Sequence, residues 1–181
     1  MTLPEGLLYR SEVLTPVEER EVIALLDRMS FAELTMRGQT ARRTVRHFGL
    51  DYDYETFRVA PGEPLPTELE WLRARAADLA GAEPDELAQT LITRYPAGAP
   101  IGWHRDAPAF GKVIGVSLGS PSRMRFQRGK GEAREVAELV LEPRSVYVLD
   151  GPARTEWQHS IPPVKELRHS ITFRTLRRRG S

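Results

Sequence analysis

The second half of the chain consists of short apolar stretches that turn-forming residues interrupt at regular intervals. From Leu87 onward, glycine, proline and serine separate stretches that alternate or are continuously apolar. Many short strands at regular spacing are typical of a β-sandwich or barrel. The strands that we predict are Gln89–Tyr95, Ile101–Arg105, Val113–Leu118, Arg123–Gln127, Glu138–Leu141, Val146–Leu149 and Ser170–Leu176.

The first half predicts two helices. Thr15 is placed to cap a helix that has Pro16 at its first position and Glu18 closing a capping box. An apolar stripe at helical spacing follows it. A second helix is expected from about Thr67 to Leu79, ahead of Gly81. Helices first and strands later favour an α+β domain in which the helices pack against a double-sheet β-core.

Length and composition narrow the chemistry that is available. A chain of 181 residues fits one domain. It contains no cysteine, so thiolate metal sites, disulfides and a cysteine nucleophile are all excluded, and any metal must be held by histidine, carboxylate or water. The formal net charge is only +1, but arginines cluster locally, which is compatible with contacts to a phosphate backbone. These clusters are Arg37, Arg42, Arg43 and Arg46, and the tail Arg177-Arg178-Arg179.

No segment approaches the roughly 18 uninterrupted apolar residues of a membrane span. The first ten residues also lack the apolar run of a signal peptide. We therefore expect a cytoplasmic protein without membrane contact, and we expect a monomer.

One segment, Ile101-Gly102-Trp103-His104-Arg105-Asp106, carries a candidate metal motif. Residues two apart on a strand point to the same face, so His104 and Asp106 can aim an imidazole and a carboxylate at one point. A further histidine, His159, lies far downstream. Two histidines and one carboxylate make the facial triad of non-haem iron(II) oxygenases, which leaves positions open for a 2-oxoacid and dioxygen. A His-x-Asp pair on its own is a weak signal, because it occurs often by chance.

The last predicted strand alternates strictly between polar and apolar residues. Arg168, Ser170, Thr172 and Arg174 share one face, and Ile171 and Phe173 share the other. If the polar face points into a barrel, its two guanidinium groups need anions there, and a dicarboxylate such as 2-oxoglutarate meets that need. If the face is solvated instead, the arginines continue the basic tail. The pattern alone leaves both readings open.

At this point the chain resembles the AlkB family of 2-oxoglutarate-dependent dioxygenases. The matching pieces occur in the family's order over roughly the last half of the chain, and their joint presence is specific. A fainter match covers residues 43–49, which resemble the family's substrate-side strand. The pieces are Thr93-Arg94-Tyr95-Pro96-Ala97-Gly98, the metal motif itself, Val116-Ser117-Leu118-Gly119, Met124-Arg125-Phe126, Trp157-Gln158-His159-Ser160-Ile161-Pro162 and Arg168 through Arg174.

The resemblance implies a double-stranded β-helix of the jelly-roll type with supporting helices. It implies a catalytic core at about residues 87–176, preceded by helices and a substrate-side region at about 1–86. His104, Asp106 and His159 would bind Fe(II). Arg174 would pair with the distal carboxylate of 2-oxoglutarate. The other implied cosubstrate residues are Tyr95 and Arg168, with Thr93 and Ser170 at positions where the family often has asparagine.

The resemblance also implies a reaction. AlkB-like enzymes hydroxylate alkyl groups on base nitrogens, such as those of 1-methyladenine or 3-methylcytosine, in DNA repair or RNA demethylation. The products are formaldehyde, succinate and carbon dioxide. The target base must leave its stack, which favours single-stranded DNA or RNA. The substrate-side candidates are Arg43, Arg46, Tyr52 and Trp103, with Tyr54 and Phe57 as further aromatic groups that core packing would also explain.

One departure from the family pattern leaves the substrate open. Members that repair nucleic acids commonly carry an acid two positions past the motif's aspartate, where this chain has Pro108. The alternatives are a dioxygenase acting on a protein side chain or a small molecule, and a nucleic-acid-binding β-domain without catalysis.

Overall fold

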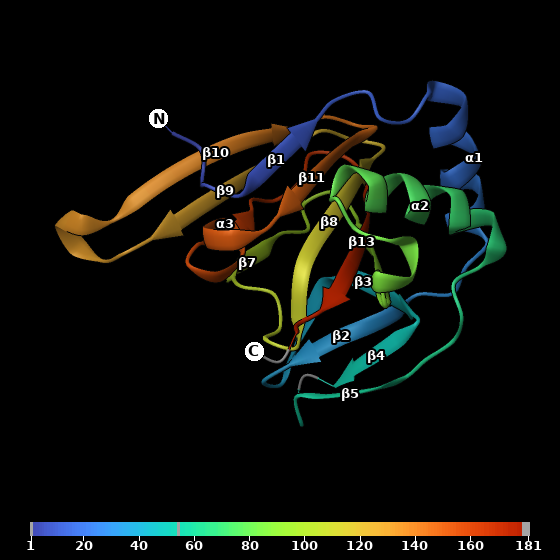
Figure 1. Ribbon diagram of the computed structural model, residues 1–181, viewed down its shortest axis with the longest axis horizontal. Helices are drawn as coiled ribbons and strands as arrows, with labels where there is room; N and C mark the ends of the chain where they lie inside the picture. The colour runs from blue at the N-terminus through green and yellow to red at the C-terminus, as the bar shows by residue number, and fades with distance from the viewer. Residues whose placement is uncertain (1, 54, 179–181) are drawn as a thin grey trace.

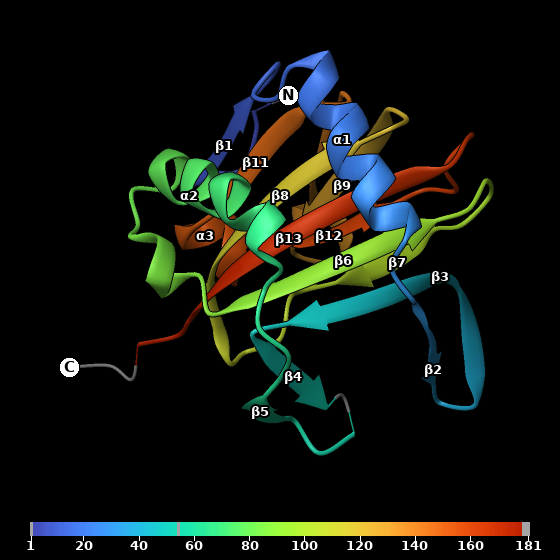
Figure 2. The same ribbon diagram turned by 90° about the vertical axis from the view of Figure 1, so that its right-hand side faces the viewer.

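The computed structural model describes residues 2–53 and 55–178, and within them two antiparallel sheets form the core (Figures 1 and 2). Buried residues from both sheets pack together between them. The strands are β1 (Leu7–Arg10), β2 (Ala32–Met36), β3 (Gln39–Phe48), β4 (Leu50–Asp53), β5 (Arg58–Pro61), β6 (Gln89–Tyr95), β7 (Ile101–His104), β8 (Phe110–Leu118), β9 (Ser122–Arg128), β10 (Glu135–Leu141), β11 (Ser145–Leu149), β12 (Gln158–Ile161) and β13 (Arg168–Leu176).

The larger sheet has seven strands in the order β1-β11-β8-β13-β6-β3-β2, and the smaller has four in the order β10-β9-β12-β7. Neighbours in each sheet are mostly distant in sequence, as expected for a jelly roll, and the predicted α+β jelly-roll core is confirmed. Strands β4 and β5 form a separate two-stranded sheet.

Two helices cover the outer face of the larger sheet. They are α1 (Pro16–Asp27) and α2 (Glu70–Leu79), and Figure 2 shows them lying across β8, β13 and β6. Their apolar residues pack against Ile171 and Phe173, the outward face of β13. A short helix α3 (Gly151–Thr155) precedes β12, and single 3₁₀ turns occur at Thr67–Leu69, Pro84–Glu86 and Gly131–Ala133.

Both predicted helices are present, with one change at the first cap. The hydroxyl oxygen of Thr15 accepts a hydrogen bond from the Glu18 amide at 3.1 Å. The Glu18 carboxylate, however, contacts Arg75 on α2. The second hydrogen bond expected of a capping box, from the Thr15 amide to the Glu18 carboxylate, is therefore replaced by an ion pair between the two helices.

The N-terminal region is part of the β-core itself. All seven strands predicted from the pattern form, with ends that differ by up to three residues, but the pattern did not predict β1 to β5 or β12, and only the resemblance of residues 43–49 indicated part of β3. Strand β3 pairs with β6, and β1 pairs with β11. Two sequence-based candidates, Tyr54 and Arg179, lie outside the described residues. Among the residues described, no helix is long and apolar enough to span a membrane.

Candidate metal centre and cosubstrate cavity

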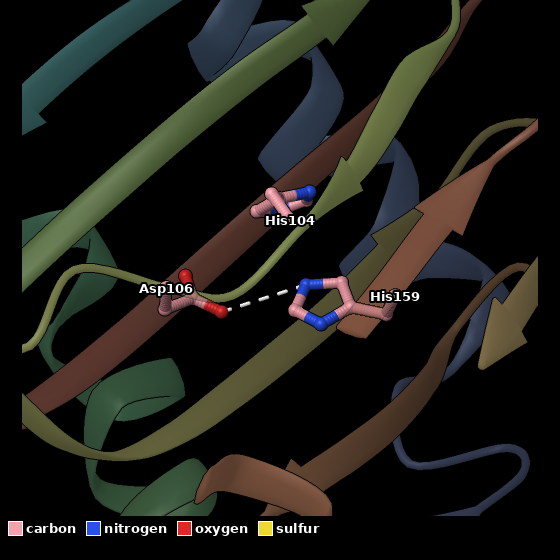
Figure 3. A group of neighbouring side chains, drawn as sticks. All are labelled: His104, Asp106 and His159. Carbon is pink, nitrogen blue, oxygen red and sulfur yellow. Dashed lines mark ion pairs between the residues drawn. The ribbon is translucent and has the colours of Figure 1, made fainter. Parts of the chain in front are cut away.

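The three candidate metal ligands meet between two neighbouring strands of the smaller sheet (Figure 3). His104 ends β7, and His159 on β12 lies directly opposite it in the antiparallel ladder. Side chains of such a pair share a face, and Asp106 follows two residues after His104. One ligand atom from each residue lies within 4.8 Å of the others. The arrangement therefore fits a single divalent metal ion held by two imidazoles and one carboxylate.

Both imidazoles are oriented to offer a nitrogen to a metal. The Nδ1 atom of His104 lies 2.8 Å from the carbonyl oxygen of Gly102, so this nitrogen carries the proton and Nε2 is left for a metal. The Nε2 atom of His159 faces Asp106 Oδ2 at 3.5 Å. Burial, and then the neighbouring His104, lowers the pKa of His159 to about 3. His159 is therefore neutral at pH 7, which is the form that binds metals.

Asp106 is kept ionised by a buried arginine. Burial on its own would raise the pKa of Asp106, but the Arg174 guanidinium, helped by the two histidines, holds it well below the usual range. Arg174 donates to Asp106 Oδ1 from Nε at 3.1 Å and from Nη2 at 2.5 Å. Its Nη1 donates to Gln89 at 2.8 Å. These bonds use Oδ1 and leave Oδ2 turned toward the histidines.

A cavity of about 340 Å³ extends from the three ligands into the space between the sheets. All four polar residues of the β13 face, Arg168, Ser170, Thr172 and Arg174, line it. The sequence left open whether the polar face of β13 points into the core or into solvent, and the structure shows that it points into the cavity. Thr93 and Tyr95 on the neighbouring strand β6 line the same cavity.

Arg168 is buried without an acid to pair with. Its side chain is 1% exposed, and its Nε donates to the Ser117 hydroxyl at 3.1 Å. Its guanidinium carbon lies 5.1 Å from the centroid of the Tyr95 ring. The Nη1 atom has no partner among the described residues. A buried guanidinium without an anion is costly, so the cavity fits a carboxylate-bearing cosubstrate such as 2-oxoglutarate.

The two arginines of β13 lie in different surroundings, which bears on the prediction that Arg174 pairs with a distal carboxylate. The ladder places Arg168 opposite Tyr95 and Arg174 opposite Gln89, at the two ends of the strand pair. Arg174 is occupied by Asp106 and Gln89, next to the metal ligands. Arg168 is the arginine whose Nη1 has no partner among the described residues.

Sequence reasoning missed two further residues around this site. Gln89 holds Arg174, and Tyr147 on β11 lines the cavity. The Tyr147 ring lies over Gly115, where a Cβ atom would come within 2.2 Å of it, so glycine is required there. Burial raises the pKa of Tyr147, which keeps its hydroxyl protonated. Alternation along the predicted strands would have placed Gln89 on the inward face with Thr93 and Tyr95.

Arg154, also missed, links the two segments that carry the ligands. From α3, shortly before His159, it donates to three backbone carbonyl oxygens at 2.8 Å. These belong to Ala107, in the loop directly after Asp106, and to Phe110 and Gly111 at the start of β8. The loop and α3 are thereby held in one arrangement.

The substrate-side candidates divide into two groups. Arg43 and Trp103 line the cavity, near the apolar residues Leu34, Met36 and Val45. Arg46 lies elsewhere, paired with Glu63 at 2.7 Å. Tyr52 is buried against Phe110, with ring centroids 5.7 Å apart, and Phe57 is 73% exposed on a turn.

A wider groove of about 1040 Å³ lies on the other side of Asp106. It is lined by both cations and acids and includes neither triad histidine. The smaller cavity, which contains all three ligands and both arginines, is therefore the site of interest.

A jelly-roll core with a His-x-Asp…His site defines the class of non-haem iron oxygenases, and comparisons with known proteins agree. The 2OG-Fe(II) oxygenase superfamily model matches residues 12–178. The tRNA (carboxymethyluridine(34)-5-O)-methyltransferase ALKBH8 of Mus musculus is 33% identical over 90% of this chain and 25% of its own length. The DNA oxidative demethylase ALKBH2 of Homo sapiens is 32% identical over 71% of this chain and 53% of its own length.

The solved structure of OsALKBH1 has the same fold. It superposes with a TM-score of 0.75 at 16% identity, covering 97% of this chain and 99% of that one. The chain belongs to the 2OG-Fe(II) oxygenase superfamily and is an AlkB-like dioxygenase, whose cofactors are Fe(II) and 2-oxoglutarate. It spans about a quarter of the length of the ALKBH8 relatives that it matches.

Proposed function

We propose that this protein removes alkyl groups from base nitrogens of DNA or RNA by oxidation. The observation that carries the proposal is a single cavity that joins the metal ligands to a buried arginine without an acid, and that reaches the exposed Met36 on β2. The printed names of the ALKBH2 and ALKBH8 relatives, a DNA oxidative demethylase and a tRNA methyltransferase, support a nucleic acid as substrate. 1-Methyladenine and 3-methylcytosine are examples of such bases.

His104, Asp106 and His159 would hold Fe(II), and Arg168 with Tyr95 would receive the distal carboxylate of 2-oxoglutarate. Thr93 and Ser170 line the same cavity and offer hydroxyl groups to the cosubstrate. When bound, Fe(II) and 2-oxoglutarate activate dioxygen for hydroxylation of a C–H bond, with release of succinate and carbon dioxide.

The protein's own contribution is orientation and the exclusion of water. Arg174 fixes the Asp106 carboxylate by holding one oxygen, so that the other faces the histidines. The Gly102 carbonyl fixes the tautomer of His104. Apolar walls from Leu34, Met36 and Val45 would surround the alkyl group.

A base can reach this cavity only after it leaves its stack, which costs least in a single strand. We therefore propose single-stranded DNA or RNA as substrate. Two arginines near the cavity and the groove, Arg37 and Arg177, have side chains without a hydrogen bond or ion pair to any described residue, which supports contacts to phosphates. Binding through such contacts should weaken steeply with salt.

We also propose that the protein works as a monomer in the cytoplasm. The large apolar side chains that are exposed are scattered over the described surface, and small scattered groups are normal for a monomer. Light scattering at increasing protein concentration tests the oligomeric state.

The test begins with metal-free protein under anaerobic conditions. Fe(II), 2-oxoglutarate and a single-stranded oligonucleotide carrying one methylated base are added, oxygen is admitted, and succinate and formaldehyde are measured. DNA and RNA versions of one sequence are compared. We expect both products in equal amounts, and their loss in His104→Ala. Arg20→Ala on the outer helix α1 serves as control and should leave both unchanged.

The outcomes separate the alternatives. Succinate without formaldehyde from any oligonucleotide would move the substrate to a protein side chain or a small molecule. Oligonucleotide binding that survives His104→Ala, with no succinate from the unmodified protein, would indicate a binding domain without catalysis. Either result would overturn the demethylase proposal.

A further inference from the structure

The cavity contains far more positive than negative charge. Of the described residues that line it, only Asp106 is an acid. Four others are arginines, which are charged at any physiological pH. They are Arg43, Arg105, Arg168 and Arg174.

Three of these arginines already have a partner or a proposed ligand. Arg174 pairs with Asp106, and Arg168 is placed for the carboxylate of the cosubstrate. Arg105 is exposed and donates to the carbonyl oxygen of Glu156 at 3.1 Å. Arg43 remains. It is half-buried on the inward face of β3, two residues from Val45, and makes no hydrogen bond or ion pair with any described residue.

Among the described residues, Asp106 is the one acid that lines the cavity, and Arg174 pairs with it. Leu34, Met36 and Val45, which line the cavity together with Arg43, are apolar. A like charge near a half-buried arginine is disfavoured more strongly than it would be in water, because solvent screens it less. A neutral group with carbonyl oxygens, by contrast, can accept hydrogen bonds from the guanidinium.

We propose that Arg43 makes this cavity selective for alkylated bases that are neutral and carry carbonyl oxygens beside the alkylated nitrogen, and that it disfavours cationic ones. The inference rests on the proposed function and narrows its substrate class. By its chemistry, 3-methyluracil belongs to the favoured class, whereas 3-methylcytosine is a cation near pH 7. The two bases have nearly the same shape, so charge and hydrogen bonding distinguish them.

The reaction on the favoured base balances without a further reactant. One oxygen atom of O2 enters a C–H bond of the N-methyl group, and the other enters 2-oxoglutarate, which becomes succinate and carbon dioxide. The C–N bond of the hydroxymethyl group then breaks. Formaldehyde leaves, and its former hydroxyl proton returns to the base nitrogen.

The test compares kcat/KM for two RNA oligonucleotides that differ only in 3-methyluracil or 3-methylcytosine. We expect at least a tenfold preference for 3-methyluracil. Arg43→Gln should bring the two values to within about threefold, and Arg43→Glu should reverse the preference. Arg20→Glu makes the same change in net charge on α1, outside the cavity, and should leave the preference unchanged.

A binding measurement accompanies the kinetics. Mn(II) replaces iron, oxygen is excluded, and the dissociation constants of both oligonucleotides are determined for the intact protein and for Arg43→Gln. The ratio of the constants should shift with Arg43 in the same direction as the kinetic preference. This readout also serves if Arg43→Glu fails to fold, because Arg43→Gln keeps the length and polarity of the side chain.

The outcomes distinguish the inference from the function on which it rests. Formaldehyde released from 3-methylcytosine as fast as from 3-methyluracil would overturn the inference and leave the demethylase intact. A preference that neither Arg43 variant changes would also overturn it. No formaldehyde from either base would overturn both.

Discussion

At the scale of single residues, two arginines on one strand face show how surroundings decide a role. Arg168 and Arg174 occur in the same alternating pattern, and both are buried. Arg174 has an acid within hydrogen-bonding distance, whereas Arg168 has only a hydroxyl and an aromatic ring. Arg174 is therefore part of the metal site in the folded protein, whereas the guanidinium of Arg168 is available to bind a ligand.

Replacing Arg168 with Met should weaken cosubstrate binding while leaving the metal-free protein as stable or more stable. Removal of a buried, unpaired charge is often neutral or stabilising by about 1–4 kcal/mol. Loss of charge-assisted bonds to a carboxylate should raise the KM for 2-oxoglutarate by about 10- to 100-fold. Urea denaturation and a 2-oxoglutarate titration check the two effects. A destabilised variant with unchanged KM would contradict the assignment.

Replacing Arg174 with Met should have the opposite effect on stability. It leaves Asp106 buried and without its main partner, which costs about 3–5 kcal/mol. The pKa of Asp106 should rise toward and beyond its ordinary value, so that affinity for Mn(II) falls at mildly acidic pH. Arg174→Lys keeps one charge and should retain part of both properties. Unchanged Mn(II) affinity in Arg174→Met would show that Arg174 does not orient Asp106.

At the scale of elements, a strand could be predicted where its sequence shows a clear pattern of apolar residues. β6, β8 and β13 have one face against the helices and one toward the cavity. Their sequences therefore contain apolar patterns that predict strands. β2 and β5 are largely exposed, so no apolar pattern marks them as strands. β3 contains three arginines and two threonines, so hydrophobic alternation does not mark it as a strand, and only the family resemblance of residues 43–49 indicated one there.

Sequence also cannot show which backbone groups a distant side chain will contact. Arg154 contacts carbonyl oxygens 43 to 47 residues away in sequence, with β8 to β11 in between. Only the way in which α3 packs beside β8 creates that contact. The sequence, by contrast, did indicate that His104, Asp106 and His159 lie together, because two of the three are only two residues apart.

Arg154→Ala should loosen the loop that follows Asp106. It removes three bonds from a charged donor to buried carbonyls, so we expect a loss of about 3 kcal/mol and much faster amide hydrogen exchange in residues 107–111. Arg105→Ala is the matched control, because Arg105 joins the same two segments through one exposed bond. It should cost less than about 1 kcal/mol. Equal exchange rates in the two variants would refute a positioning role for Arg154.

At the scale of the whole molecule, the site depends on closure of two sheets around a polar interior. Both histidines of the candidate metal site come from the smaller sheet, while both inner arginines come from the larger one. Sequence predicted that such a double-sheet core would form, and the family resemblance indicated a substrate-side strand at residues 43–49, but neither predicted that β1, β2 and β3 would all extend the larger sheet. Those residues contact the core through β6 and β11, which are far from them in sequence.

The fold also buries three histidines, and this predicts how the free energy of unfolding depends on pH. Burial is the largest cause that lowers the pKa of His47, His159 and His169, and for His159 the pKa falls from 6.5 to about 3. Between those values the unfolded chain binds protons that the folded protein excludes. Stability is therefore greatest above pH 6.5 and is lost as pH falls, by up to about 1.4 kcal/mol per pH unit for His159, with contributions of the same sign from His47 and His169.

Urea denaturation of the metal-free protein at pH 8, 6 and 5 measures this loss, and His169→Gln, outside the site, should reduce its slope. Mn(II) should stabilise the protein strongly at pH 8 and progressively less toward pH 5, because metal and proton compete for His159. A stability that stays level from pH 8 to pH 5 would mean that the histidines titrate normally in the folded state. In that case the two sheets would not exclude water from the centre as tightly as this packing requires.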